Sequence, residues 1–478
     1  MVKDLQKYAA LLLLKPPSQI IFSSTNEFLG NGVNSPRFYG FYVFLMPKSI
    51  ITQTRIADLG EPRITVIGGG FGGLEVVRNL KHVKAQVVLF DRHNHHTFQP
   101  LLYQVATSGL ETSSIVFPLR KRFSYQPNFY FRLGEVTHIK PEENLIETSI
   151  GQARYDYLVL ATGATTNFYG MQDIEKSSMA MKTIEDAIQL RNHILCNMER
   201  ALLTDDQETM NSLMDHVIVG GGPTGVELAG ALSELKRNVF PKDYKELDMS
   251  NMDIILIEAG PRLLNGMSEQ ASAKALEFLQ KMGVKVLLNC SVKSYDGHDI
   301  LLSTGEKLIS RTMVWAAGIK GNPIEGLKPD SVTRGNRIQV DAYNRVKGFE
   351  NIFAIGDVAL MDGDTTFPKG HPQMAQPAMQ QGKLVAGNIQ RLLDKKPLQP
   401  FHYFDKGSMA TVGRNKAVVD TRVFKTQGFF AWFIWMFIHL ISITGFRNKV
   451  FTFLSWLWSY FSYDRSNRLI IGRPREEN

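Results

Sequence analysis

The chain has 478 residues, of which 44% are hydrophobic and 21% are charged, and its formal net charge is +8. This length suffices for two or three domains with full cores, and the composition is that of a globular protein. The basic balance suits an anionic membrane surface, nucleic acid or merely solubility, but the chain has no zinc-type cysteine spacing and no interleaved basic and aromatic motif. We therefore discount nucleic acid as a partner.

The first 60 residues differ from the rest and are predicted to form a poorly structured extension. The apolar run at residues 8–14 resembles part of a signal peptide, but Lys15-Pro16-Pro17 interrupts it and no small-residue cleavage site follows. Residues 38–46 are apolar, yet far fewer than the ~20 that a spanning helix needs. One hypothesis is that translation begins at Met46.

The first informative motif is Gly68-Gly69-Gly70-Phe71-Gly72-Gly73, which follows the β-branched strand predicted at residues 63–67. Its first glycine permits a tight turn, its third lets backbone amides approach a pyrophosphate, and its last lets the next helix pack closely. A second predicted strand, residues 87–90, ends in Asp91, at the distance where a carboxylate binds a ribose hydroxyl. The motif predicts a dinucleotide site.

Histidines cluster just after this strand, at His93, His95 and His96. A metal site is the alternative interpretation, but the cluster has no carboxylate or cysteine partner at ligand spacing, and a loop beside a cofactor fits as well. We predict no metal site. Further along, a buried strand at residues 155–160 runs into the small-residue turn Ala161-Thr162-Gly163, which leaves space for a flat ring or a phosphate.

A second motif of the same kind, Gly220-Gly221-Gly222-Pro223-Thr224-Gly225, follows a helix predicted at residues 185–203 and a strand at 216–219. The strand at residues 253–257 ends in Glu258, and a second small-residue turn occurs at residues 315–318. The two halves thus look like variations on one plan. Ordinary βαβ units with incidental glycines are the alternative, against which both acidic residues argue.

The cysteines narrow the chemistry. Cys196 and Cys290 lie far apart and outside any paired motif. Flavoprotein disulfide reductases need a redox cysteine pair, commonly soon after the first glycine motif, and residues 74–103 contain none. The sulfide-oxidising flavoproteins that are related to these reductases also depend on cysteines. Both chemistries are disfavoured.

Two apolar segments follow near the C-terminus. Residues 428–444 are almost wholly apolar, Arg447 and Lys449 interrupt the run, and residues 450–461 place small polar side chains along one helical face. We predict helices that lie in one membrane leaflet, with basic residues toward anionic lipid. A buried helical hairpin at a dimer interface and a single spanning helix are the alternatives. No polar spanning helices are visible, so we predict no proton pumping.

The two glycine motifs with Asp91 and Glu258, the turn at residues 161–163 and the strand end Ile355-Gly356-Asp357 form a characteristic set. Together they resemble the two-dinucleotide-binding-domain flavoproteins over residues 62–393. The segments at residues 98–106, 226–228, 375–380, 445–449 and 464–465 resemble one branch, the type II NADH:quinone oxidoreductases. The resemblance implies an α/β fold with two Rossmann-like domains, the second inserted in the first, and a C-terminal membrane-associated helical segment. The implied parts are an extension (1–60), an FAD domain (61–182 and 323–395), an NADH domain (183–322) and a membrane-anchoring region (396–478).

The resemblance also implies roles for particular residues. The catalytic residues are Glu227, near the quinone and in proton handling, with Gln376 and Gln380 at the flavin and quinone. The residues that bind FAD or NADH are Gly68, Gly70, Phe71, Gly72, Gly73, Asp91, Gln99, Val136, Ala161, Thr162, Gly163, Gly220, Gly222, Pro223, Thr224, Gly225, Glu258, Gly318, Gly356, Asp357, Ala375, Gln376 and Lys449. The assignment of Lys449 rests only on the distance of this residue from the C-terminus.

The expected reaction carries electrons from NADH through FAD to a membrane quinone. Glu258 favours NADH over NADPH because a carboxylate repels a 2′-phosphate, although nearby Arg262 leaves dual use open. Expected partners are the quinone and the bilayer surface, through residues 428–478, on the cytoplasmic face of the inner membrane, and a homodimer is left open. The rival functions are a soluble NAD(P)H reductase with a protein acceptor and a non-enzymatic interaction protein that binds flavin and NAD.

Overall fold

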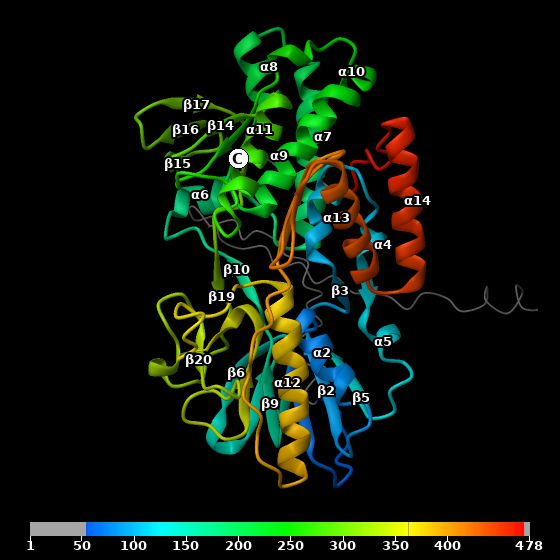
Figure 1. Ribbon diagram of the computed structural model, residues 1–478, viewed down its shortest axis with the longest axis vertical. Helices are drawn as coiled ribbons and strands as arrows, with labels where there is room; N and C mark the ends of the chain where they lie inside the picture. Colours follow the sequence, from blue (N-terminus) through cyan, green and yellow to red (C-terminus); the bar gives the residue numbers. More distant parts are fainter. Residues whose placement is uncertain (1–53, 362, 473–478) are drawn as a thin grey trace, which may run out of the picture. The chain divides into compact units, whose positions relative to one another are not determined.

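Two parallel five-stranded sheets organise the residues that the structure describes, 54–361 and 363–472 (Figure 1). The structure is a computed structural model, and all described residues belong to one unit, residues 51–478. The predictions for residues 1–46 lie outside the described residues.

The first sheet has the strand order β21-β9-β1-β2-β5. Its strands are β21 (Ile352–Ala354), β9 (Tyr157–Leu160), β1 (Arg63–Ile67), β2 (Gln86–Asp91) and β5 (Phe129–Leu133). Every neighbouring pair is parallel. The β-branched residues Ile64 and Val66 are fully buried, as expected where helices cover both faces of a parallel sheet.

The second sheet repeats this arrangement with the order β11-β18-β12-β13-β14. Its strands are β11 (Met179–Ala180), β18 (Thr312–Trp315), β12 (His216–Val219), β13 (Ile254–Ile257) and β14 (Lys285–Leu287). In both sheets the strand before the glycine motif lies between the strand that ends in the acid and the strand that ends in the small-residue turn. The predicted common plan is confirmed. Strand β11 pairs in the second sheet, just before the predicted boundary at residue 183.

Helices cover the two sheets. Helix α2 (Phe71–Asn79) lies beside α12 (Ala375–Leu393) in the lower half of Figure 1, and α9 (Pro223–Asn238), α7 (Ile184–Ala201) and α11 (Glu269–Lys281) lie in the upper half. Thr183 and Asp186 form a capping box at the start of α7, which fixes where this helix begins.

The remaining elements are short. The other helices are η1 (Gln99–Leu101), α3 (Leu102–Ala106), α4 (Thr112–Ile115), α5 (Leu119–Arg122), η2 (Pro141–Glu143), α6 (Gln172–Ser177), α8 (Gln207–Met214), α10 (Phe240–Asp243), η3 (Met249–Asn251), η4 (Pro329–Ser331) and η5 (Gly356–Val358). The other strands are β3 (His95–Thr97), β4 (Val116–Pro118), β6 (Val136–Lys140), β7 (Leu145–Thr148), β8 (Gly151–Arg154), β10 (Ala164–Thr166), β15 (Val292–Tyr295), β16 (Asp299–Leu302), β17 (Lys307–Ile309), β19 (Ile319–Gly321), β20 (Ile338–Val340) and β22 (Ala359–Met361).

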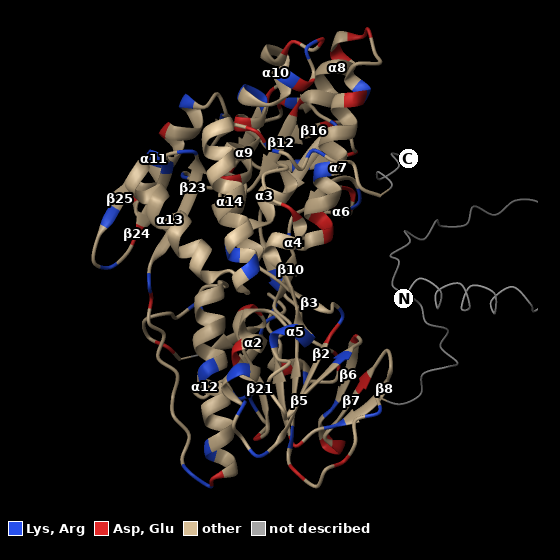
Figure 2. Ribbon diagram, turned by 90° about the vertical axis from the view of Figure 1, so that its right-hand side faces the viewer, with Lys and Arg blue, Asp and Glu red and all other residues tan. Residues whose placement is uncertain are grey.

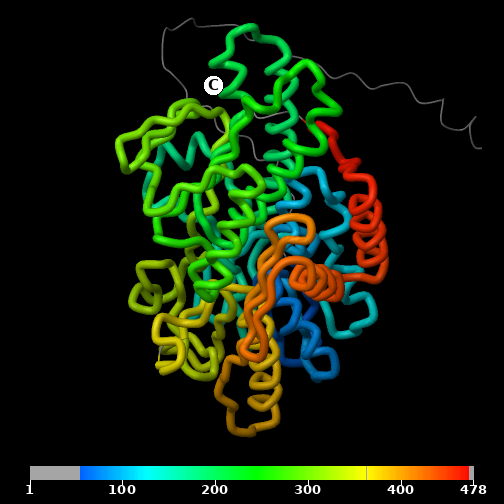
Figure 3. The backbone as a smooth tube through the Cα atoms, turned by 45° about the horizontal axis from the view of Figure 1, so that its top comes forward, coloured from blue at the N-terminus to red at the C-terminus, as the bar shows by residue number. Residues whose placement is uncertain are grey.

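The predicted membrane-anchoring region begins with a sheet that the sequence analysis missed. Strands β23 (Ser408–Gly413), β24 (Lys416–Asp420) and β25 (Lys425–Gln427) form an antiparallel sheet, drawn in orange in Figure 3, that contacts α9 and α11. A Cβ atom on Gly230 of α9 would lie 1.7 Å from the carbonyl oxygen of Val412. Glycine at position 230 therefore allows β23 to contact the helix backbone directly.

Substitution Gly230→Ala is expected to destabilise the protein. The new methyl group would overlap the backbone of β23, and because backbone cannot rotate away, the helix and the sheet must separate, at a cost of about 1 to 3 kcal/mol. The measurement is the free energy of unfolding in denaturant. Gly387→Ala is the matched control, since that glycine also lies in a helix but a Cβ atom there would meet nothing within 4 Å. Equal stability of the two variants would contradict the packing argument.

Two largely apolar helices lie near the end of the described chain, α13 (Phe429–Ser442) and α14 (Phe446–Ser462). The second segment begins earlier than residue 450, because Arg447 and Lys449 lie in the first turn of α14 and the break between the helices falls at residues 443–445. Gly445 has a φ of +90°, and a Cβ atom there would lie 2.2 Å from the ring of Phe117, so this position both turns the chain and seats it.

The outer faces of these helices are apolar. Helix α13 contains no Lys, Arg, Asp or Glu, and α14 contains only Arg447 and Lys449, so both helices are almost entirely tan in Figure 2. Phe430, Phe446 and Phe461 are 72%, 83% and 76% exposed. In the described part of the chain, no helix combines the length and hydropathy needed to cross a bilayer.

Candidate active site

The first glycine-rich turn is closed toward the sheet and open on its other side. Gly68 has a φ of +104°, and a Cβ atom there would lie 2.3 Å from the carbonyl oxygen of Ala161. A Cβ atom on Gly73 would lie 1.9 Å from the carbonyl oxygen of Gly68, so α2 packs directly on the turn. A Cβ atom on Gly70, in contrast, would meet nothing within 4 Å. The open side is where a ligand can approach the backbone.

The second turn has the same geometry. Gly220 has a φ of +115°, and a Cβ atom there would lie 2.6 Å from the carbonyl oxygen of Ala316. A Cβ atom on Gly225 would lie 2.0 Å from the carbonyl oxygen of Gly220, and one on Gly222 would meet nothing within 4 Å.

Both helices that follow begin without a side-chain cap. Gly70 and Gly222 are the N-cap residues of α2 and α9, and neither helix has an acidic residue in its first turn. The first N–H groups of a helix lack intrahelical partners and attract anions. Each turn therefore fits a pyrophosphate group.

The acidic residues brace the turns. Asp91 accepts hydrogen bonds from the backbone N–H groups of Gly69, at 2.6 Å, and His93, at 2.7 Å. Glu258 accepts hydrogen bonds from those of Gly221 and Gly260, both at 2.6 Å. A carboxylate offers about four lone-pair directions, so each one can hold its turn and still accept a ribose hydroxyl.

One cavity of about 1910 Å³ runs along both turns. Predicted cofactor-binding residues in its lining are Gly68, Gly70, Phe71, Gly72, Asp91, Gln99, Val136, Ala161, Thr162, Gly163, Gly222, Pro223, Thr224, Glu258, Gly318, Gly356, Asp357, Ala375, Gln376 and Lys449. Gly73, Gly220 and Gly225 lie behind this lining, where they permit the close packing described above. The structure thus brings nearly the whole predicted set to one space.

The two predicted glutamines of α12 lie in different surroundings. Gln376, in its first turn, lines the cavity. Gln380 lies outside the lining, and its amide donates to the carbonyl of Phe404 at 2.9 Å and accepts from the N–H of Phe404 at 3.0 Å. Both ends of the Gln380 amide thus fix a backbone segment, and a catalytic role for Gln380 stays a prediction.

Three residues that the sequence analysis did not single out contact the strand end at Gly356 and Asp357. Buried Gln381 accepts a hydrogen bond from the N–H of Gly356 at 2.7 Å, and Gln373 donates to the carbonyl of Asp357 at 3.0 Å. Lys182 approaches the Asp357 carboxylate at 3.6 Å. The sequence did hold a signal for this difference. Gln380 and Gln381 are adjacent, and adjacent side chains on a helix point about 100° apart, so the two glutamines cannot face the same site.

Glu227 is buried where the large cavity meets a smaller one of about 100 Å³. Burial raises the pKa of Glu227 from 4.5 to about 8, and the N–H of Thr411, 3.4 Å from the carboxyl, opposes the shift weakly. The Trp435 indole N–H faces the same carboxyl without meeting hydrogen-bond geometry. A shift of this size is worth about 5 kcal/mol, more than the ~1 kcal/mol that a helix N-terminus contributes. Burial therefore outweighs the helix N-terminus, which by itself would favour the charged form of Glu227.

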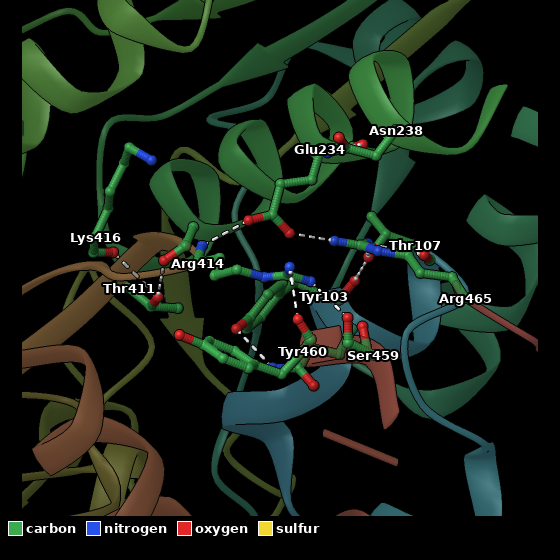
Figure 4. A network of polar contacts seen from close by, with 12 residues as sticks. Tyr103, Thr107, Glu234, Asn238, Thr411, Arg414, Lys416, Ser459, Tyr460 and Arg465 are labelled. Atoms are coloured by element: carbon green, nitrogen blue, oxygen red, sulfur yellow. Dashed lines mark hydrogen bonds and ion pairs between the residues drawn. The ribbon is translucent and has the colours of Figure 1, made fainter. Parts of the chain in front are cut away.

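A polar network behind Glu227 holds the C-terminal segment in place (Figure 4). Glu234, two turns further along α9, accepts from Arg465 at 2.7 Å and from the backbone N–H of Arg414 at 2.6 Å. The Arg414 guanidinium donates to the carbonyls of Ser459 and Tyr460 at the end of α14, at 2.5 and 2.9 Å. These contacts fix α14 relative to the helix that carries Glu227.

The histidine cluster does not converge on a point. His96 is buried and its Nδ1 lies 3.1 Å from the carbonyl oxygen of Gly69, so the ring donates to the first turn. Burial lowers the pKa of His96 to about 4. Within residues 54–361 and 363–472, no group of three or more His, Cys, Asp or Glu side chains is arranged to hold a metal ion.

Lys449 also reaches the cavity wall, where its ammonium donates to the carbonyl of Ile441 at 2.5 Å. The contact joins α14 to the end of α13. Tyr103, on α3, lines both cavities and accepts a hydrogen bond from Gln104 at 2.8 Å.

Comparison with known proteins places the same features in one group. Residues 62–382 match the pyridine nucleotide-disulphide oxidoreductase family, and residues 405–463 match the NDH2 C-terminal domain. The type II NADH:quinone oxidoreductases Ndh and NdhA of Mycobacterium tuberculosis are 35% and 33% identical, over 86% and 87% of this chain and 90% of each relative. The solved structure of NDH2 from Plasmodium falciparum in complex with NADH covers 86% of this chain and 100% of its own, with a TM-score of 0.79 at 22% identity.

Proposed function

Because the chain belongs to the type II NADH:quinone oxidoreductase family, we propose that it carries electrons from NADH through bound FAD to a membrane quinone, without pumping protons. The observation that carries the proposal is the duplicated turn: Gly70 and Gly222 both present open backbone to one cavity. Two nucleotide sites on one cavity bring two redox cofactors within reach of each other.

The first turn with Asp91 and Asp357 suits FAD, and the second turn with Glu258 suits NADH. FAD supplies the chemistry that accepts a hydride and passes on two electrons. The protein positions both nucleotides through the open turns and the uncapped helix N-termini. Lys182 beside Asp357 adds a positive charge to the first site.

Glu258 supports the preference for NADH. Its carboxylate lies on the cavity wall, where it would repel a 2′-phosphate and accept a 2′-hydroxyl. Arg262, which could offset this charge, donates instead to Asn265 and to the carbonyl of Met267.

Glu227 and Gln376 suit the quinone end of the cavity. Reduction of a quinone takes up two protons, and a carboxyl with a pKa near 8 still holds its proton at neutral pH. Gln376 offers an amide that can donate to a quinone carbonyl.

The apolar outer faces of α13 and α14 suit attachment to one membrane leaflet. Exposed aromatic side chains cover both helices, and Arg447 and Lys449 add positive charge where α14 begins. Attachment on the cytoplasmic face of the inner membrane would bring the cavity to the depth of a quinone headgroup. A homodimer through the same faces is the competing arrangement.

Anaerobic titration tests the function. NADH added to the purified, FAD-loaded protein is expected to bleach the flavin absorbance, and a quinone added next is expected to restore it. Failure to bleach would refute the proposal, and bleaching without recovery on quinone addition would favour the soluble reductase with a protein acceptor.

A further inference from the structure

His439 is the one ionisable side chain of α13, and it faces inward. Most of this helix presents phenylalanine and isoleucine outward, whereas His439 lines the large cavity together with Ile438, Ile441 and Ser442. The ring is only partly buried by area, and the cavity is the space that its open part borders. The imidazole thus adds a nitrogen atom to the part of the cavity wall that α13 forms.

The contacts of the ring fix its tautomer and its orientation. Nδ1 lies 2.7 Å from the carbonyl oxygen of Trp435. A carbonyl oxygen only accepts, so Nδ1 carries the hydrogen, and in the neutral ring Nε2 keeps a lone pair. The ring stacks on Trp435, with centroids 4.1 Å apart, and meets the edge of Phe98 at 6.1 Å. Among the residues that the structure describes, Nε2 has no hydrogen-bond partner.

Burial lowers the pKa of His439 to about 4, so the ring is neutral at physiological pH. Glu227, whose carboxyl the Trp435 indole N–H faces, keeps its proton at that pH. The cavity therefore offers an O–H donor and an N acceptor around one indole ring. A quinone has two carbonyl acceptors, and a hydroquinone has two hydroxyl donors. Glu227 matches the oxidised ring, and Nε2 of His439 matches the reduced one.

We propose that Nε2 of His439 accepts a hydrogen bond from a hydroxyl group of the hydroquinone product. This inference rests on the proposed function. The contact transfers neither a proton nor an electron; it strengthens as a quinone oxygen gains its hydrogen, and such an interaction favours the forward reaction because it is absent in the starting state. Helix α13 then contributes a substrate contact as well as a lipid-facing surface.

The test compares two substitutions in the full-length, FAD-loaded protein. His439→Phe keeps a ring against Trp435 and Phe98 but removes the lone pair, and His439→Gln places an amide oxygen near the position of Nε2. Binding of a short-chain benzohydroquinone and of its benzoquinone is measured anaerobically by calorimetry. For His439→Phe we expect the hydroquinone dissociation constant to rise about tenfold, the loss of one hydrogen bond, while that of the quinone changes little. His439→Gln should retain most of the hydroquinone affinity.

His402→Phe is the control, because His402 is exposed and outside the cavity lining. Wild-type hydroquinone binding by His439→Phe would overturn the proposal. Equal weakening of quinone and hydroquinone would also overturn it, since that result indicates an altered cavity shape. If His439→Phe fails to retain FAD, His439→Gln is measured instead. This variant keeps an acceptor near the position of Nε2, so a loss of its preference for hydroquinone over quinone would overturn the proposal. Bleaching of the wild-type flavin by NADH tests the proposed function separately.

Discussion

Glu227→Gln is expected to slow quinone-dependent reoxidation of the enzyme by about 10²-fold or more, the usual contribution of a general acid. Bleaching of the flavin by NADH should keep its wild-type rate, because the substitution leaves both glycine-rich turns untouched. Glutamine has nearly the same shape as the protonated carboxyl but cannot release a proton. Stopped-flow spectroscopy that follows the two half-reactions separately is the measurement.

The pH dependence gives the same prediction a second readout. Glu227 is protonated below its pKa of about 8, so wild-type reoxidation should decline as the pH rises through that value, and the decline should be absent in Glu227→Gln. Stability follows the same sign. Because folding raises this pKa above its ordinary 4.5, the stabilising contribution is complete below pH 4.5 and is lost as the pH rises toward about 8.

Glu269→Gln is the control for both readouts, since it makes the same chemical change on an exposed helix residue outside the cavity lining. Unchanged reoxidation in Glu227→Gln would assign the proton delivery to another group. A persistent bend near pH 8 in that variant would do the same.

Local sequence patterns predicted the parallel sheets and the turns because each depends on residues near one another in the chain. A β-branched strand, a glycine that adopts positive φ and an acidic strand end form one βαβ unit. The repeated strand order follows from repeating that pattern. The predicted end of a helix differs from the observed one where a contact with a distant residue decides it. The break at Gly445, for example, depends on the ring of Phe117.

The site was predictable as far as it lies on those turns. The protonation of Glu227 was not, because its burial depends on Thr411 and Trp435, which lie far along the chain. Strand β23 packs directly on the backbone of α9 at Gly230, which belongs to no sequence motif. The same reason explains Gln380, since the segment at Phe404 that occupies its amide is placed by tertiary packing.

Attachment to the membrane calls for point substitutions rather than deletion of residues 428–478. Ala431 and Trp435 are buried, and His439 and Ile441 line the cavity, so a truncated chain would lose part of the active site together with the apolar surface. The outward side chains can be changed alone. Phe430, Phe433 and Phe437 follow one face of α13 and are exposed.

Changing these three phenylalanines to serine is expected to release the protein from lipid vesicles. Since each ring is already partly covered, withdrawing all three from the bilayer costs about 4 kcal/mol together, a fall in partitioning of roughly 10³-fold. Co-sedimentation with vesicles containing anionic lipid measures the partitioning, and Leu203→Ser with Tyr125→Ser, both exposed elsewhere, controls for general loss of apolar surface. Turnover with a water-soluble quinone should persist, while turnover with a long-tailed quinone in vesicles should collapse. Wild-type sedimentation of the triple variant would contradict the prediction, because it would show that these three rings do not hold the protein on the bilayer.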